Sequence, residues 1–384
     1  MKIDIVFGGK AGQGPNILSE VVSEGLIESG FYVFYSRDYE SLIRGGHNFN
    51  QLTFSESSVR SNSSKIDILV CLDENTEKIH SKNLKKGAIV LSGEHGNMFF
   101  AGAVYRILCM DFKILENQLK KLKNFEENFK EAKSGYDSCK RTRNVKCPLK
   151  KYTGFKFMNG NQAIAVSAVN SGLEYYYGYP MTPATPVMME LGQMGLDRKN
   201  KHKLIELESE IAVINAALGS SIAGSLAMAG TSGGGFDLMT EALSMAGQAK
   251  IPIVVYNSSR AGASTGLATY TGQEDVNLVV HGGHGEFSRI VIAPGDPLET
   301  YEAVNQLFYL SQKFRIPAIL LGDKHLAESK ITFSSFKPKM LEINKSITKL
   351  EKFNSYEHDS LGLATESAEI TRENVKARMK KEQE

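Results

Sequence analysis

The sequence predicts an α/β protein with two parallel-sheet domains followed by a charged helical tail. Its 384 residues are enough for about two domains with sizeable cores. Short apolar runs, such as 66–72 and 87–91, alternate with helical patterns, which is typical of parallel sheets with right-handed crossovers. The expected parts are a first domain, a basic linker, a second domain and the tail, at 1–135, 136–158, 159–330 and 331–384.

Composition narrows the functional class. The net charge of +2 gives no bulk electrostatic reason to expect nucleic acid as a partner. The sequence contains no apolar run of the roughly 20 residues that a membrane helix needs, and its N-terminus enters a strand pattern at once. The four cysteines form no Cys-x-x-Cys pair, which favours a reducing cytoplasm and argues against an iron–sulfur or zinc site built by this chain alone.

The first domain begins with a strand, a glycine-rich turn and a helix, an arrangement typical of Rossmann-like folds. The turn contains Gly9, Gly12 and Gly14, and such turns expose backbone N–H groups beside a helix N-terminus, where anions bind. The spacing is not Gly-x-Gly-x-x-Gly, so a phosphate-bearing ligand or a tight subunit contact is favoured over a dinucleotide. Arg44 precedes two glycines, and locally it is best explained as a solvated loop charge.

Between the domains the chain becomes charged and then basic. Residues 119–131 have the pattern of an amphipathic helix, and 138–151 carry several lysines and arginines. No aromatic residues interleave the basic run as a surface for nucleic-acid bases would require, so a solvated linker is the favoured interpretation.

A proline–threonine loop stands out in the second domain. At 178–186 an apolar run ends, and Pro180, Pro183 and Pro186 then exclude regular strand pairing or a helix interior. Thr182 and Thr185 lie between these prolines. Such a rigid loop suits the wall of a binding site, although a structural turn explains the same local pattern.

Glu210 is expected where a strand passes into a helix. Apolar residues alternate with glutamates at 204–208, and Ser209 is a favourable N-cap for a helix over 210–219. In an open α/β sheet, ligands bind at this edge. The alternative is a glutamate that only stabilises the helix N-terminus.

Two further patterns lie in the second domain. Arg260 stands in a loop rich in glycine and hydroxyl groups, where an arginine can grip a carboxylate with two hydrogen bonds, or serve as a surface or subunit contact. His281 and His284 are separated by glycines and have no adjacent Cys or Asp to complete a metal-ligand set, so no metal site is expected.

Several motifs in one order resemble the α subunit of 2-oxoacid:ferredoxin oxidoreductases, and the first domain resembles the γ domain that is often fused ahead of it. The likeness extends to about residue 328. In the α part it is carried by 161–163, 179–186, 208–210, 231–233, Arg260 with 264–267, and 281–285; in the γ part it is carried by Gly9, 12–14 and 44–46.

The resemblance implies a subunit that shares thiamine diphosphate with a β subunit, decarboxylates a 2-oxoacid such as pyruvate or 2-oxoglutarate to an acyl-CoA, and passes electrons to ferredoxin. Glu210 would hydrogen-bond the aminopyrimidine ring and promote the imino tautomer that activates the cofactor. Arg260 would hold the substrate carboxylate, and Thr182 would face that carboxylate or the cofactor. Thr265 and Thr269 would line the substrate pocket.

Other roles follow from the same likeness. Tyr179 and Pro180 would contact the cofactor, and the loop of the CoA-associated γ domain would contain Gly9, Gly12, Gly14 and Arg44. Mg²⁺ and an iron–sulfur cluster would belong to the β subunit, in a cytoplasmic (αβ)₂ complex without which this chain is inactive.

The sequence also departs from the family pattern. Ala268 replaces the proline of the usual Ser-Thr-Gly-Leu-Pro-Thr run, and the 233–235 triplet lacks the family's proline. The tail looks like an interdomain segment without the domain that follows it in the family. A non-catalytic interaction or scaffold subunit therefore remains the alternative.

Overall fold

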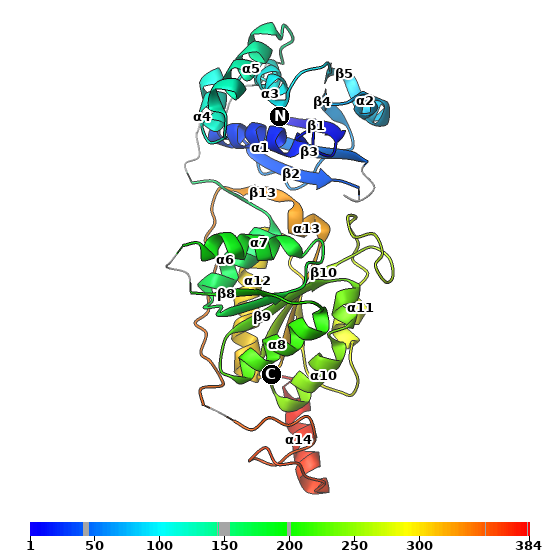
Figure 1. Ribbon diagram of the computed structural model, residues 1–384, viewed down its shortest axis with the longest axis vertical. Helices are drawn as coiled ribbons and strands as arrows, with labels where there is room; N and C mark the ends of the chain where they lie inside the picture. Colours follow the sequence, from blue (N-terminus) through cyan, green and yellow to red (C-terminus); the bar gives the residue numbers. More distant parts are fainter. Residues whose placement is uncertain (41–45, 144, 146–153, 198–200, 350, 382) are drawn as a thin grey trace. The chain divides into compact units, whose positions relative to one another are not determined.

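The structure is a computed structural model that describes residues 1–40, 46–143, 145, 154–197, 201–349, 351–381 and 383–384. It divides the chain into two units (Figure 1). The first contains 1–158 together with 329–336, and the second contains 159–328 and 337–384. Among the described residues, no helix is both long enough and apolar enough to cross a membrane.

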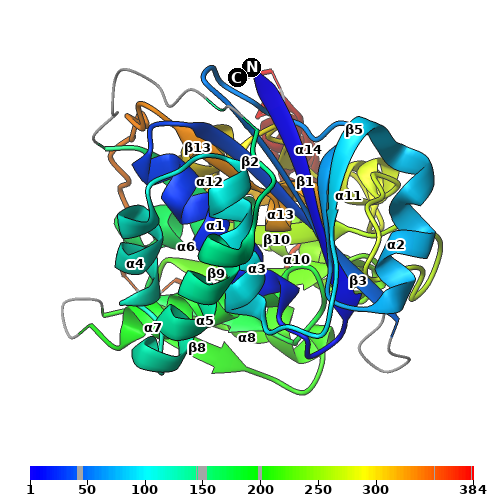
Figure 2. The ribbon, with the colours of Figure 1, turned by 90° about the horizontal axis from the view of Figure 1, so that it is seen from above.

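The first unit is a seven-stranded sheet in the order β5-β4-β1-β3-β2-β13-β6. Helices α1, α3, α4 and α5 pack on one face around the largest apolar cluster of this unit (Figure 2). Helix α2 lies beside β4 (Figure 1). The strands are β1 (Lys2–Lys10), β2 (Tyr32–Asp38), β3 (His47–Ser55), β4 (Ile66–Cys71), β5 (Leu84–Leu91), β6 (Lys156–Met158) and β13 (Lys330–Phe333). The helices are α1 (Pro15–Glu28), α2 (Glu74–His80), the 3₁₀ helix η1 (Ser81–Asn83), α3 (Asn97–Ile107), α4 (Phe112–Leu119) and α5 (Phe125–Ser138).

The first sheet is mixed, whereas the sequence pattern predicted a parallel one. β1, β4 and β5 are parallel, but β3 runs antiparallel to both β1 and β2. The connection between β2 and β3 spans only residues 39–46. Parallel neighbours need a crossover of about a dozen residues or more, so this short connection reverses the chain.

The predicted tail differs from the structure at its start. Residues 329–336 belong to the first unit, where β13 pairs antiparallel with both β2 and β6. Ile331 and Phe333 are buried there. Farther along the chain, α14 (Ala368–Lys380) is helical, as the sequence pattern predicted.

The second unit is a six-stranded sheet, parallel throughout, in the order β11-β12-β10-β9-β7-β8. Helices α6, α7 and α12 cover one face, and α8, α10 and α11 cover the other (Figure 1). The strands are β7 (Tyr175–Gly178), β8 (Lys203–Glu206), β9 (Ala227–Ser232), β10 (Ile253–Ser259), β11 (Ile290–Ile292) and β12 (Pro317–Asp323). The other helices are α6 (Gly160–Asn170), α7 (Thr185–Gly195), α8 (Glu210–Ile222), α9 (Gly234–Asp237), α10 (Thr240–Ala249), α11 (Val276–His281), α12 (Pro297–Phe314) and α13 (Lys324–Glu328).

A pair of histidines, His80 buried and His47 half-buried, links β3 to α2 in the first unit. The Nε2 atoms of His47 and His80 lie 2.9 Å apart, and both rings contact Phe49. Burial and, to a lesser extent, the neighbouring His47 lower the pKa of His80 to about 4. Burial also lowers the pKa of His47, although Asp73 and Glu40 oppose the change. The fold therefore requires neutral imidazoles here.

This pair predicts an acid-sensitive first unit. Because the folded pKa of His80 lies below its ordinary value of 6.5, the unfolded chain takes up the proton first as the pH falls. The contribution of His80 is complete above pH 6.5 and is lost as the pH falls towards about 4, at a cost of about 3 kcal/mol. In urea unfolding at several pH values, His80→Gln should reduce this loss, whereas His95→Gln, at an exposed position, should not. Equal pH dependence in wild type and His80→Gln would contradict this account.

Candidate active site

The predicted site residues of the second unit gather at the carboxyl edge of its sheet. From β7 the chain moves outward to β8 and then returns to β9 on the other side of β7. The strand order therefore reverses between β7 and β9, which is where ligands bind in open α/β sheets. The segments that follow these two strands contain the proline–threonine loop and the 233–235 glycine turn.

Glu210 is the first residue of α8, as the sequence predicted. The Ser209 hydroxyl caps the helix by accepting a hydrogen bond from the N–H of Ala212 at 3.3 Å. This cap fixes the start of the helix immediately after β8, and the Glu210 side chain turns inward, where the residue is 5% exposed. A carboxylate at a helix N-terminus is favoured by the helix dipole, so the fold can accommodate this charge out of contact with most of the solvent.

Arg260 follows β10 and connects directly to the proline–threonine loop. Its Nε donates to the carbonyl oxygen of Thr182 at 2.6 Å, and the Ser232 hydroxyl donates to the same oxygen at 2.7 Å. Burial lowers the pKa of Arg260, while the carboxylates of Glu210 and Asp275 act in the opposite direction. Thus Glu210, Thr182 and Arg260, which are separated in sequence, form one group.

Two buried residues, Asn161 and Tyr256, also hold the proline–threonine loop. The side-chain amide of Asn161 donates to the carbonyl of Pro183 at 3.0 Å, and its oxygen accepts from the Tyr256 hydroxyl at 3.2 Å. The peptide bond between Thr182 and Pro183 is cis. These contacts hold the loop from β10 and α6, so its position is set by the sheet rather than by the loop alone.

The remaining predicted residues lie around this group. Tyr179 and Pro180 are exposed at the start of the loop that follows β7. Thr265 is exposed and Thr269 half-buried in the 261–270 loop, which is closed by a hydrogen bond from the N–H of Leu267 to the carbonyl of Ala261 at 2.8 Å. A Cβ added to Gly234 would lie 3.2 Å from the carbonyl of Ser264, so this loop runs beside the glycine turn.

Several polar residues of the site were not among the predicted site residues. Asp275 accepts a hydrogen bond from the side-chain amide of Asn257 at 3.0 Å. Burial raises the pKa of Asp275, and hydrogen bonds from Asn257 and Ser259 act against that rise. Thr231 and Asn257 are register partners on β9 and β10. The sequence signal for them was the position of Thr231 and Asn257 near strand ends, whereas nothing local to Asp275 distinguishes it.

The predicted turn of the first unit is present. Gly12 and Gly14 have φ of 88° and 77°, and Gly14 directly precedes α1. A Cβ at Gly9 would come within 2.9 Å of the side chain of Leu72. The backbone conformation therefore favours glycine at Gly12 and Gly14, and the close contact with Leu72 requires it at Gly9. Arg44 lies outside the described residues.

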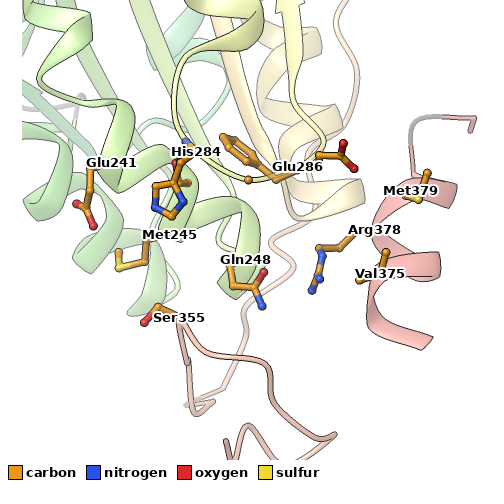
Figure 3. Close-up of a pocket in the computed structure, with 12 residues that line it drawn as sticks. Glu241, Met245, Gln248, His284, Glu286, Ser355, Val375, Arg378 and Met379 are labelled. Carbon is orange, nitrogen blue, oxygen red and sulfur yellow. Dashed lines mark hydrogen bonds between the residues drawn. The ribbon is translucent and has the colours of Figure 1, made fainter. Parts of the chain in front are cut away.

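A cavity of about 570 Å³ lies elsewhere in the second unit, between α10, the 284–287 segment and α14 (Figure 3). Its lining includes Glu241, Gln248, His284 and Arg378, and none of the predicted site residues. Arg378 pairs with Glu357 at 2.5 Å, which fixes α14 beside this cavity.

Comparisons with known protein families match both units. A family model described as the thiamine diphosphate-binding part of pyruvate flavodoxin/ferredoxin oxidoreductases matches residues 166–382. A second model, described as pyruvate ferredoxin/flavodoxin oxidoreductase, matches residues 4–96. The first match covers more than half of the chain and includes the whole Glu210 group.

Individual proteins that resemble this chain are also subunits of oxidoreductases that act on 2-oxoacids. The 2-oxoacid:ferredoxin oxidoreductase α subunit of a Sulfolobus species is 28% identical over 90% of this chain and 67% of its own length. The 2-oxoglutarate synthase subunit KorA of Archaeoglobus fulgidus is 36% identical over 45% of this chain and 51% of its own length. The chain thus spans between half and about two thirds of the length of these two relatives.

Among solved structures, the 2-oxoglutarate:ferredoxin oxidoreductase from Magnetococcus marinus, with 2-oxoglutarate, coenzyme A and succinyl-CoA bound, matches with a TM-score of 0.88. The sequences are 24% identical, and the match covers 100% of this chain and 78% of that one. At this identity the likeness shows that the fold is shared.

Proposed function

The chain belongs to the pyruvate flavodoxin/ferredoxin oxidoreductase family, and on that premise we propose that it is an α-type subunit, with a fused γ-type domain, that oxidatively decarboxylates a 2-oxoacid to an acyl-CoA. It is a subunit of a thiamine diphosphate-dependent oxidoreductase. The observation that carries the proposed chemistry is the group formed by Glu210, Arg260 and the Thr182 carbonyl at the switch point of the sheet.

The residues present fit the pyrimidine end of thiamine diphosphate. A buried carboxylate can meet a ring nitrogen without competition from bulk water. The Thr231 hydroxyl is buried without a hydrogen-bond partner among the described residues. Because Gly235 has no side chain, its backbone approaches both this hydroxyl and the Glu210 carboxylate more closely than any other residue would allow. When bound, thiamine diphosphate supplies a nucleophilic carbon and an electron sink for decarboxylation.

In this proposal Glu210 holds and moves a proton at the pyrimidine nitrogen. The cap on α8 orients its carboxylate, and burial keeps it at low dielectric, where the hydrogen bond is stronger. Tyr179 and Pro180 contact the cofactor from the start of the proline–threonine loop.

Arg260 and Thr182 are proposed to bind the substrate carboxylate. Nε of Arg260 is occupied by the Thr182 carbonyl, so the terminal guanidinium nitrogens are the groups available to a substrate. One of them, Nη2, lies 3.8 Å from Met181 Sδ, a weak acceptor that a carboxylate would outcompete. Thr265 and Thr269 line the same pocket from the 261–270 loop.

We propose that a β-type partner completes the site, in an (αβ)₂ assembly. It would provide the diphosphate and Mg²⁺ site and an iron–sulfur cluster, with ferredoxin as acceptor and coenzyme A as co-substrate. Large apolar side chains are exposed on the segments around the site edge, which supports a protein partner there. They are Ile211, Leu238, Leu267, Tyr270 and Val276, each between 46% and 56% exposed.

The test is co-expression with a β-type subunit, followed by an assay for dye reduction that requires a 2-oxoacid, coenzyme A and thiamine diphosphate together. Turnover that needs all three supports the proposal. Tight association without turnover on any 2-oxoacid would favour the non-catalytic scaffold subunit.

Removal of the Arg260 guanidinium is expected to weaken 2-oxoacid binding. Arg260→Ala loses a charge-assisted contact of about 1.5–3 kcal/mol, so KM should rise by about one to two decades. Because Arg260 also holds the Thr182 carbonyl, Arg260→Lys should recover only part of this affinity. Steady-state kinetics of the complex measure both, and an unchanged KM in Arg260→Ala would contradict the carboxylate role.

A further inference from the structure

Thr231 carries a hydroxyl that the fold itself does not use. The residue lies near the carboxyl end of β9 with none of its surface exposed, and Oγ1 has no hydrogen-bond partner among the described residues. An unpaired buried hydroxyl costs about 1–3 kcal/mol. Valine has nearly the same shape and suits a strand equally well. Packing alone therefore gives no reason for threonine at this position.

The hydroxyl lies next to the Glu210 carboxylate. A Cβ added to Gly235 would overlap Thr231 Oγ1 and would come within 2.7 Å of Glu210 Oε1. The two oxygen atoms thus border the same small space beside the Gly235 backbone. Only glycine at 235 lets both oxygen atoms approach its backbone this closely.

Further polar residues connect Thr231 with the surroundings of Arg260. Thr231 is the register partner of Asn257, whose amide donates to Asp275 at 3.0 Å. Asp275 in turn attracts Arg260. Thr231 and Asn257 are thus neighbouring buried residues on β9 and β10, and Arg260 is attracted by both Glu210 and Asp275.

We propose that Thr231 is a positioning residue whose hydroxyl donates a hydrogen bond to the Glu210 carboxylate in the cofactor-loaded complex and holds that carboxylate against the pyrimidine nitrogen. The inference rests on the proposed function. In the chain without cofactor the hydroxyl is a cost to stability, and in the loaded site it orients the proton-transferring group.

The test compares Thr231→Val, which removes only the hydroxyl, with Thr231→Ser, which retains it. In Thr231→Val the melting temperature of the isolated chain should be unchanged or higher, because an unpaired buried hydroxyl is gone. In the complex with the β-type partner, kcat should fall about tenfold, as expected for one lost hydrogen bond, while the thiamine diphosphate Kd and the 2-oxoacid KM stay within about threefold. Thr231→Ser should restore most of kcat.

Thr300→Val is the matched control, since Thr300 is equally buried but donates to the Asp296 carbonyl at 2.8 Å in α12. It should lower the melting temperature and leave kcat unchanged. The inference is overturned if Thr231→Val keeps full kcat, or if its melting temperature falls together with its activity. It is also overturned if Thr231→Ser has as low a kcat as Thr231→Val. If Glu210→Gln also retains full turnover, the proposed function fails as well; if Glu210→Gln is inactive, only the role of Thr231 is lost.

Discussion

Glu210→Gln is expected to lower kcat of the assembled complex by about 10²–10⁴-fold, the range found when a proton-transferring side chain is removed. Glutamine keeps the shape of the side chain and its place at the start of α8, but it cannot accept and return the proton. Since the change adds no volume to a site where Glu210 is 5% exposed, the complex should still assemble and bind its substrate. Pre-steady-state and steady-state kinetics with saturating thiamine diphosphate measure the loss.

Glu208→Gln provides the control for this prediction. Glu208 lies two residues before Glu210 in the sequence and is exposed. The kcat of Glu208→Gln should therefore match that of wild type. Full turnover by Glu210→Gln, or equal losses in both variants, would remove the catalytic role from Glu210. The alternative of a glutamate that only stabilises the N-terminus of α8 would then stand.

Gly235→Ala is expected to reduce both cofactor affinity and kcat, together by about 10²-fold or more. The added Cβ would overlap Thr231 Oγ1 in β9 and come within 2.7 Å of Glu210 Oε1, so the Glu210 carboxylate would have to move away from its present position. A displacement of about 1 Å at a catalytic group is enough for a loss of this size. Thiamine diphosphate titration of the complex and kinetics of the saturated enzyme separate the two effects.

Gly219→Ala is the control for this substitution. Gly219 lies in α8, and a Cβ there would meet no atom within 4 Å. Alanine should therefore stabilise the helix by about 0.5–1 kcal/mol without changing turnover. If Gly235→Ala binds the cofactor and turns over as wild type does, the close approach of the residue 235 backbone to Glu210 has no role in the site.

The elements around Glu210 could be predicted from the residues next to it in the sequence. Ser209 has the hydroxyl of an N-cap, the preceding residues alternate, and the structure places the cap and the start of α8 at the predicted residues. Capping is a short-range interaction between neighbours in sequence, which is why one segment can be interpreted without the rest of the chain.

The pairing of strands that lie far apart in the sequence was harder to predict. The parallel character predicted for the first sheet was wrong for β3, β2, β13 and β6, and β13 joins that sheet from the far end of the second unit's sequence. A strand pattern states which residues face a core, but it does not state which partner will supply the neighbouring hydrogen bonds. The length of the 39–46 connection was the available signal for the reversal at β3.

Arg260 illustrates the same limit at the site. Its sequence neighbours indicated a loop with anion-binding chemistry, but the hydrogen bond from Nε to the Thr182 carbonyl joins segments 78 residues apart. That bond decides which guanidinium nitrogens can meet a substrate.

By itself the sequence determined the α/β class, the helix that begins at Glu210 and the set of motifs that place the chain in its family, because each depends on residues close together along the chain. Only the tertiary structure decided that Glu210, Arg260 and Thr182 gather at one switch point, with Thr231 and Gly235 beside the carboxylate. That decision depends on strand order and on space between side chains, which arise when distant segments pack against each other.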